Sequence, residues 1–302
     1  MKKYFQLFFS LLGIPLFLSC RSKTSLNTAA NGKSLLWEVS SNGLSRPSYF
    51  FGTMHLMCAE DAELNETIQS LIKSVDLIYL EVDMDNASEL LTGILDLRKK
   101  SGTTLKSALP EEDYNKVKSF FESYQPSVPF SVLELQPPLM ISSSLFELLL
   151  PCERKNGVEI KIIDEAYKEK KETKGLETIA FQSSIFDSIP YKDQAQDLVK
   201  SIDSLEKNRK AMAEMIQVYK EQDVEKLYSL SANEESSTSS YMELLLYKRN
   251  RNWVDQFPSI AKTGSTLFAV GAGHLGGEKG VLQLLKQQGY IVRPIANGST
   301  LE

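Results

Sequence analysis

The sequence predicts an α/β protein in which the two chain ends form a pseudo-repeated mixed sheet and a mostly helical insertion separates them. Three observations predict this class. At each end an apolar run leads to a Gly-x-x-His motif, Gly52 to His55 and Gly271 to His274, and the chain has no other histidine. Each motif is followed by apolar residues at helical spacing and then by a second apolar run. Between about residues 105 and 260 the helical period dominates.

The first end unit begins with a predicted hairpin, whose strands at 35–39 and 49–51 are joined by a turn at 40–43. Its second strand leads into the first histidine motif. Apolar residues at helical spacing then predict a helix within 62–73, and the compact apolar run 77–80 predicts a buried strand with acids at its end.

The second end unit repeats this order. A strand at 267–270 leads to the second histidine motif, a helix follows through 281–285 and ends at Gly289, and residues 290–294 supply a strand. Ligands of α/β proteins bind at the carboxyl ends of such strands. We therefore expect two imidazoles to point at one place.

The chain between the two units is predicted to cover one face of this core. The predicted elements are helices at 111–124 and 132–150, a short strand at 160–163, long helices within 194–230 and 241–257, and a Glu/Ser/Thr-rich loop at 231–240.

The first residues are typical of an export signal, because Lys2 and Lys3 precede an apolar stretch at 5–18 that is short for a membrane span. The stretch ends at Ser19 and Cys20, which resembles a bacterial lipoprotein signal cut before Cys20 and lipidated there. Ordinary secretion and an uncleaved anchor are the alternatives. We expect an exported, membrane-anchored envelope lipoprotein with a signal peptide at 1–19, a polar tether at 20–34 and a single domain at 35–302, whose insertion covers about 105–260.

The net charge and the number of cysteines indicate which binding partners and which covalent links to expect. The net charge is −5, and −7 without Lys2 and Lys3, because residues 1–19 contain no acid. No basic patch interleaved with aromatic residues is present, so no nucleic-acid partner is expected. With Cys20 assigned to the lipid, Cys58 and Cys152 remain as an even pair, for which a disulfide is predicted. Two free thiols, or metal ligation by Cys58, are the alternatives.

Two histidines and a carboxylate form a ligand set for a divalent metal ion. Glu81 is the preferred carboxylate, because it ends the strand expected to lie beside the strand of His55; Asp83 and Asp85 compete for this role. The alternative is that His55 and His274 only hydrogen-bond backbone groups and that Glu81 is a solvated acid.

Two further segments carry candidate catalytic groups. Glu177 lies in a predicted glycine turn at 175–178, where Thr178 can cap the following helix and the helix macrodipole favours an acid. Arg249 and Asn250 lie within a predicted helix, from which Arg249 can stabilise a developing oxyanion. The alternatives are a helix N-terminal acid and a solvated basic face.

Five motifs in order resemble the TraB/GumN family over nearly the whole mature chain. They are Gly52-Thr53-Met54-His55, the strand ending at Glu81, Gly175-Leu176-Glu177-Thr178 with Gln182, Arg249-Asn250, and Gly271-Ala272-Gly273-His274-Leu275. That family is similar to the Tiki metalloproteases and, more distantly, to erythromycin esterases and ChaN-type haem-binding lipoproteins. The resemblance implies an α/β core with helical additions and a metal-dependent hydrolase site that contains both histidines, Glu81 and Arg249.

We therefore expect an exported metal-dependent hydrolase, a peptidase rather than an esterase, that acts on a peptide. The expected metal ligands are His55, Glu81 and His274, and the expected catalytic residues are Glu177 as general base, Arg249 and Asn250. Zinc, manganese, cobalt and iron all suit the ligand set. The rival is a non-catalytic lipoprotein that sequesters a peptide or haem, and a third possibility is a scaffold that has lost its metal.

Overall fold

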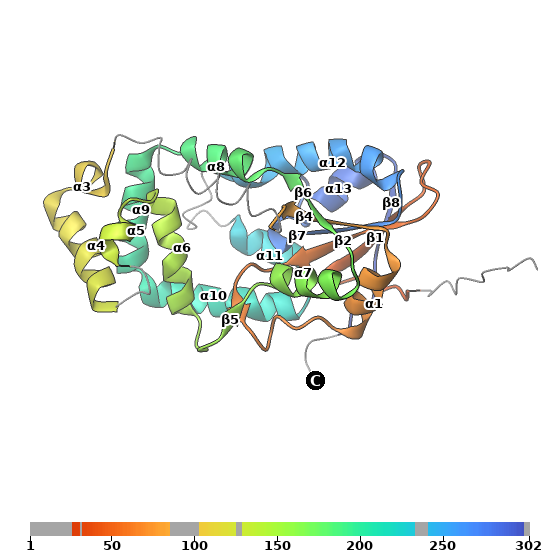
Figure 1. Cartoon of the computed structure of the whole chain (residues 1–302), viewed down its shortest axis with the longest axis horizontal. Coiled ribbons are helices and arrows are strands. Elements are labelled where there is room, and N and C mark those ends of the chain that lie inside the picture. Colours follow the sequence, from red (N-terminus) through yellow and green to blue (C-terminus); the bar gives the residue numbers. More distant parts are fainter. Residues whose placement is uncertain (1–25, 31, 85–102, 125–128, 233–240, 299–302) are drawn as a thin grey trace, which may run out of the picture.

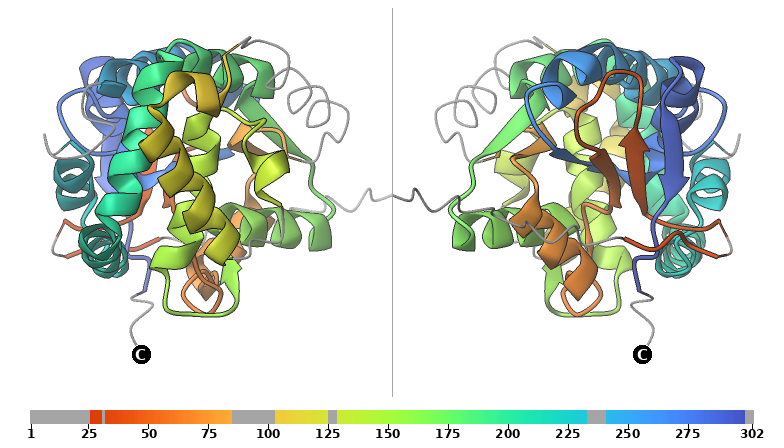
Figure 2. Two further views of the ribbon diagram at one scale, coloured as in Figure 1. Left: turned by 90° about the vertical axis from the view of Figure 1, so that its left-hand side faces the viewer. Right: turned by 90° about the vertical axis from the view of Figure 1, so that its right-hand side faces the viewer.

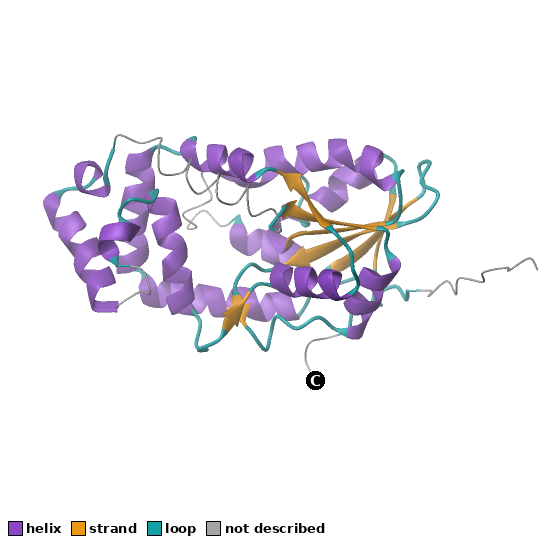
Figure 3. Cartoon of the chain, in the orientation of Figure 1, coloured by secondary structure: helices purple, strands orange, loops and turns teal. Residues whose placement is uncertain are grey.

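The computed structural model describes residues 26–30, 32–84, 103–124, 129–232 and 241–298. A mixed sheet lies at one end of the molecule and a cluster of helices at the other, which confirms the predicted α/β class (Figures 1 and 3). The predicted leader with Cys20, Asp85 and nearly all of the predicted loop at 231–240 lie outside the described residues. Among the described helices, none has the length and apolar character of a membrane span.

The main sheet has six strands in the order β6-β4-β7-β2-β1-β8. β1 runs antiparallel to both of its neighbours, and the other strands are parallel. The strand bounds are β1 Leu36–Ser40, β2 Ser48–Thr53, β4 Leu77–Val82, β6 Thr173–Glu177, β7 Thr266–Gly271 and β8 Ile291–Pro294; β3 Met57–Cys58 and β5 Lys155–Asn156 form a separate two-stranded sheet.

Both predicted end units are present, but in the sheet a strand of the second unit lies between the two strands of the first. The first is β2, α1 (Glu66–Ser74) and β4, and the second is β7, α13 (Val281–Gln287) and β8. The predicted hairpin is confirmed, with Trp37 of β1 opposite Phe50 of β2. The expected neighbour of the Glu81 strand is wrong: β4 pairs with β7, the strand of the second histidine motif, because β7 lies between β4 and β2.

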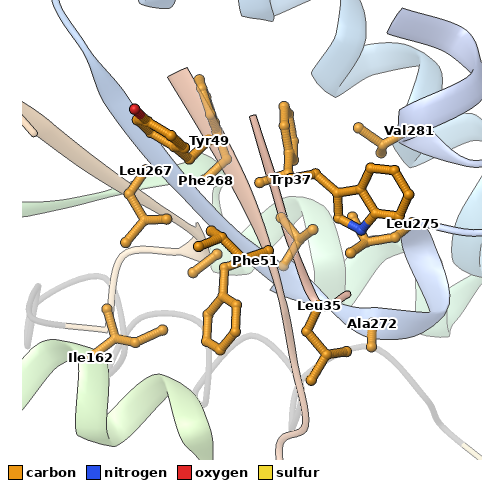
Figure 4. Packing of buried hydrophobic residues seen from close by; sticks show 14 of the residues in the cluster. Leu35, Trp37, Tyr49, Phe51, Ile162, Leu267, Phe268, Ala272, Leu275 and Val281 are labelled. Carbon is orange, nitrogen blue, oxygen red and sulfur yellow. The ribbon is translucent and has the colours of Figure 1, made fainter. Parts of the chain in front are cut away.

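Side chains of the central strands alternate between two packed faces, which explains their continuous apolar runs. Phe50 stacks on Phe268 of β7 at 4.8 Å between ring centroids and meets Phe257 of α12 (Lys248–Ala261) on one face. Phe51 points to the opposite face, toward Ile162 of α7 (Val158–Lys168) (Figure 4). The core thus lies on both faces of β2 and β7.

The predicted short strand at 160–163 is wrong, since these residues belong to α7. Val158, Ile162 and Ala166 are buried at a spacing of four, and this helical stripe overrides the local strand preference of a β-branched run. The predicted glycine turn at 175–178 is also wrong in part, because Gly175 and Glu177 lie within β6 and pair with β4. Thr178 does cap the next helix, as expected.

A second hydrophobic cluster lies in the helical part of the molecule, and its members come from α3, α4, α5, α6 and α9. Seen from the left-hand side of Figure 1, these helices lie in front of the sheet (Figure 2, left). The predicted helix at 132–150 is broken into α5 and α6 by Pro137 and Pro138. The remaining bounds are α3 Leu105–Ala108, α4 Glu111–Tyr124, α5 Phe130–Leu133, α6 Pro138–Leu149, α8 Ile179–Asp187, α9 Tyr191–Asp203, α10 Leu205–Lys220, α11 Val224–Ser231, the π-helix η2 Glu243–Tyr247 and the 3₁₀ turn η3 Ala272–His274.

Candidate functional site

The candidate site lies at the carboxyl ends of the four parallel strands β2, β7, β4 and β6, on the side that faces the helical cluster (Figure 1). The register brings these ends level, since Thr53 lies opposite Gly271 and Val82 lies opposite Glu177. Residues at the ends of adjacent parallel strands therefore meet, although they are far apart in the sequence.

Gly271 marks the point where three of the predicted side chains converge. A Cβ atom built on Gly271 would lie 3.2 Å from Glu81 Oε1, 3.7 Å from His55 Nε2 and 3.6 Å from His274 Cδ2. The backbone N–H of Gly271 also donates to Glu81 Oε1 at 2.7 Å. A side chain at position 271 would therefore contact both imidazoles and the carboxylate.

His274 is buried, and its hydrogen bonds fix its tautomer. Its Nδ1 lies 2.6 Å from Asn250 Oδ1, while Asn250 Nδ2 donates to the carbonyl of Lys279 at 2.9 Å. Because the amide nitrogen is used at Lys279, Asn250 Oδ1 accepts, and Nδ1 of His274 carries the proton. Nε2 keeps its lone pair and lies 3.8 Å from Glu81 Oε1. Burial lowers the pKa of His274 to about 3, so the ring is neutral.

His55 is held differently, at the accessible side of the site. Its Nδ1 lies 2.7 Å from Glu159 Oε1, and 68% of its side chain is exposed, against 6% for His274. Partial desolvation acts to lower the pKa of His55, but the hydrogen bond and charge of Glu159 outweigh it and raise the pKa to about 9. Glu159 is itself buried and also accepts from Thr53 Oγ1 at 2.5 Å.

Arg249 binds both remaining acids of the site. Its Nη2 lies 2.6 Å from Glu81 Oε2, and its Nε donates to Glu177 Oε2 at 2.9 Å. Its Nη1 donates to the carbonyl of Leu245 in η2 at 3.1 Å and faces His274 Nε2 at 3.2 Å. With its donors directed at these groups, Arg249 would stabilise an oxyanion only by exchanging one of these contacts for the substrate.

The two acids bound by Arg249 differ in their remaining contacts. Burial acts to raise the pKa of Glu81, but the charges of Arg249 and His55 and the hydrogen bond from the N–H of Gly271 outweigh it, and the pKa lies well below its usual range. Gln182 of α8 reaches both acids, with its Nε2 3.4 Å from Glu81 Oε2 and 3.3 Å from Glu177 Oε2. Oε1 of Glu177 is buried and has no hydrogen-bond partner. A buried carboxylate oxygen in this state is expected to meet a cation, a proton donor or water.

The donor set fits a divalent metal ion chemically. It offers a neutral imidazole at His274, a second imidazole at His55 and the ionised Glu81 around the position of a Cβ at Gly271, and Arg249 links Glu81 to Glu177, whose Oε1 has no partner among the described residues. Within the described ranges, however, no three His, Cys, Asp or Glu side chains are close enough together to hold an ion. Arg249 Nη1, a cationic donor, lies against His274 Nε2.

Cys58 and Cys152 form a disulfide with 5.8 Å between their Cα atoms. The bond lies beside the small sheet in which Met57 and Cys58 of β3 pair with Asn156 and Lys155 of β5. It thus links the segment after the first histidine motif to the segment that leads into α7.

The structure brings together His55, Glu81, Glu177, Arg249, Asn250 and His274, and Gln182 with them. The carboxylate nearest to Gly271 belongs to Glu81 and not to Asp83, which directly follows the same strand. Sequence reasoning missed Glu159, which contacts His55 from the start of α7. A signal for it does exist, because Gly157-Val158-Glu159 repeats the Gly-apolar-Glu pattern of residues 175–177.

Comparisons with known proteins give a family model and distant relatives. The sequence model of the TraB/PrgY/gumN family matches residues 35–294. The chain is 23% identical over 351 aligned residues to the protein named Metalloprotease TIKI1 of Xenopus tropicalis, covering 92% of this chain and 67% of that protein. It is 34% identical over 83 residues to Metalloprotease TIKI homolog of Amphimedon queenslandica, covering 25% of this chain and 16% of that protein. No solved structure matches the chain significantly.

Proposed function

The chain belongs to the TraB/PrgY/gumN family, and from this premise we propose that it is an exported, lipid-anchored, metal-dependent hydrolase that cleaves a peptide. The observation that carries the proposal is the convergence of His55 Nε2, His274 and Glu81 Oε1 around Gly271. A relative covered over most of this chain is named a metalloprotease, which supports metal-dependent hydrolysis and proteolysis.

In the proposed mechanism His55, Glu81 and His274 hold the ion. When bound, a divalent ion such as zinc, manganese, cobalt or iron would supply Lewis acidity and a water of lowered pKa. The charges of the chain suit a cation: Glu81, Glu159 and Glu177 provide three carboxylates, whereas Arg249 provides one permanent positive charge among them. Neutral His274 presents its Nε2 lone pair without a proton to displace.

Glu177 is the proposed general base. Its Oε2 is held by Arg249, which leaves the buried Oε1 as the atom that takes a proton. Arg249 keeps Glu81 and Glu177 in place, and Gln182 supports both through its side-chain amide. Asn250 acts through His274, because it fixes the tautomer in which Nε2 carries no proton.

A binding lipoprotein that sequesters a peptide or haem is the second candidate. One observation favours it: the guanidinium of Arg249 lies against His274 Nε2 and between the two acids, so the described side chains form a closed ion-pair network. Such a network can stabilise a binding site in a protein that catalyses no reaction.

The deciding experiment begins with metal analysis of the purified chain, followed by cleavage of a peptide library with and without a chelator. Bound metal and chelator-sensitive cleavage are expected. Metal binding without cleavage of any peptide or ester would favour the binding protein, and absence of both would overturn the metal-dependent proposal.

A further inference from the structure

We propose that Glu159 is a positioning residue for His55, which holds the imidazole so that Nε2 faces the space beside Gly271. The proposed function assigns His55 a ligand role but does not say what aims its ring. His55 is mostly exposed, so its packing alone does not fix the ring. The inference rests on the proposed function in one respect only, namely that Nε2 of His55 is the atom that binds the metal ion.

The contacts of the ring carry the inference. Nδ1 lies 2.7 Å from Glu159 Oε1, while Nε2 lies 3.7 Å from the position that a Cβ of Gly271 would take. The two nitrogens lie on opposite edges of an imidazole, so a hydrogen bond at Nδ1 turns Nε2 toward the site. Glu159 is held in its turn by Thr53 Oγ1, which belongs to the same histidine motif.

The backbone of His55 is held by the same short segment. The N–H of Val158 donates to the carbonyl of Met54 at 3.1 Å. A Cβ atom on Gly157 would lie only 2.5 Å from the carbonyl oxygen of His55, so a side chain there would force the two segments apart. Gly157, Val158 and Glu159 therefore fix both the main chain and the ring of the histidine turn.

A second attachment lies on the other side of His55. Met57 pairs with Asn156, Cys58 pairs with Lys155, and the disulfide joins Cys58 to Cys152. The histidine turn is thus tied to the start of α7 before and after His55. Such double attachment would be unnecessary for a histidine that only faces solvent, and it gives Glu159 a rigid base from which to orient the ring.

The proposal is tested on the full chain, prepared without metal, by nuclear magnetic resonance of ¹⁵N-labelled histidine. Only two histidines contribute signals, and His55→Ala assigns them. A slowly exchanging, downfield Nδ1–H signal is expected for His55, and a second for His274 through Asn250. Glu159→Met keeps the side-chain length but has only a weakly accepting thioether, so it should remove the His55 signal and keep that of His274. Glu159→Gln, whose amide oxygen accepts, should restore it.

Glu165→Met is the matched control, because Glu165 lies on the same helix and pairs with Lys168 away from the site. It should leave both signals unchanged. The pH-independent affinity for Zn²⁺, obtained from titrations at several pH values, should fall about 10–100-fold in Glu159→Met. A wild-type chain without a protected His55 signal, or a His55 signal that survives Glu159→Met, would overturn the proposal. Neither outcome depends on metal binding or peptide cleavage, so a failure here is distinct from a failure of the proposed function.

Discussion

The two histidines share a sequence motif, but the structure gives them different environments. His274 is buried, neutral and fixed by Asn250, whereas His55 is exposed and paired with Glu159. A ligand approaching the site meets His55 first. His274 provides the preformed part of the proposed metal site, because its Nε2 needs no deprotonation near neutral pH.

Replacing either histidine should remove the metal. We expect His55→Ala and His274→Ala to lose bound metal and turnover together, because each deletes one proposed ligand. Metal content by mass spectrometry of the purified variants is the measurement, with Tyr167→Ala, a change at an exposed residue of α7, as control. Retention of metal by both histidine variants would contradict the ligand assignment.

Glu177→Gln should separate catalysis from metal binding. The amide keeps the size of the side chain but cannot accept a proton as a base, so turnover should fall roughly 10²–10⁴-fold while metal and fold are retained. The unpartnered Oε1 of Glu177 is the atom that this change disables. If Glu177→Gln strips the metal instead, Glu177 is a ligand, and Glu81 becomes the better candidate for the base.

Asn250→Ala should destabilise the protein and weaken the site at once. It leaves the buried Nδ1–H of His274 and the carbonyl of Lys279 without their partner. We expect a loss of about 1–3 kcal/mol in the free energy of unfolding, measured in urea, together with reduced metal content. Asn252→Ala, two residues along the same helix, should change neither by as much. Equal losses in the two variants would show that Asn250 has no special role.

The sequence predicted most of this site because its residues sit in short local motifs. His55 and His274 follow strands, Glu81 and Glu177 lie at the ends of strands, and Arg249 lies in a helix. Glu159 was not predicted, because its role depends on a contact between α7 and the histidine turn, which are distant in the sequence. The ion pairs of Arg249 with Glu81 and Glu177 were not predicted either, since a run of basic residues in the sequence does not show which acids lie around one of them.

At the scale of elements, apolar runs predicted the strands β1, β2, β4, β7 and β8 and the hairpin of β1 and β2, but not the order of the other strands. β7 lies between β2 and β4, and the antiparallel β1 separates β2 from β8. Strand order is decided by packing over the whole sheet, to which local patterns contribute little. The same limit explains β6, whose pairing with β4 turns a predicted glycine turn into an edge strand.

The disulfide that links β3 to the segment before β5 can be tested by thiol titration and by its effect on stability. Thiol titration of the unfolded, unreduced mature protein should detect no free thiol from Cys58 or Cys152. Replacing both by serine should lower the free energy of unfolding by about 2–5 kcal/mol, because the bond closes a long loop in the unfolded chain. Reduced wild-type protein should match the double variant in urea denaturation. Two titratable thiols in the unreduced protein would refute the pairing.

The whole molecule joins two hydrophobic clusters, one around the sheet and one among α3–α6 and α9. Helical content between the end units was predictable from periodicity, whereas the placement of the helices beyond the strand ends was not, since it depends on contacts between remote segments (Figure 1). This placement puts the candidate site between the sheet and the helical cluster, where a bound peptide would meet both.

The first described residues and Glu177 lie at opposite edges of the main sheet. Thr28 pairs with Ile295, next to β8, whereas Glu177 lies on β6 at the opposite edge of the sheet. Cys20→Ala should release the protein from the membrane fraction or leave its leader uncut, because no thiol remains to carry the lipid.

The same variant should keep its metal content and its melting temperature, because neither depends on the tether. Fractionation of cells, a processing gel and thermal melting of the purified protein measure these outcomes. Cys58→Ser is the matched control for loss of a cysteine: it should stay in the membrane fraction with normal processing while it melts earlier, since it lacks the disulfide. Normal processing and unchanged membrane retention of Cys20→Ala would count against lipidation and favour another means of attachment.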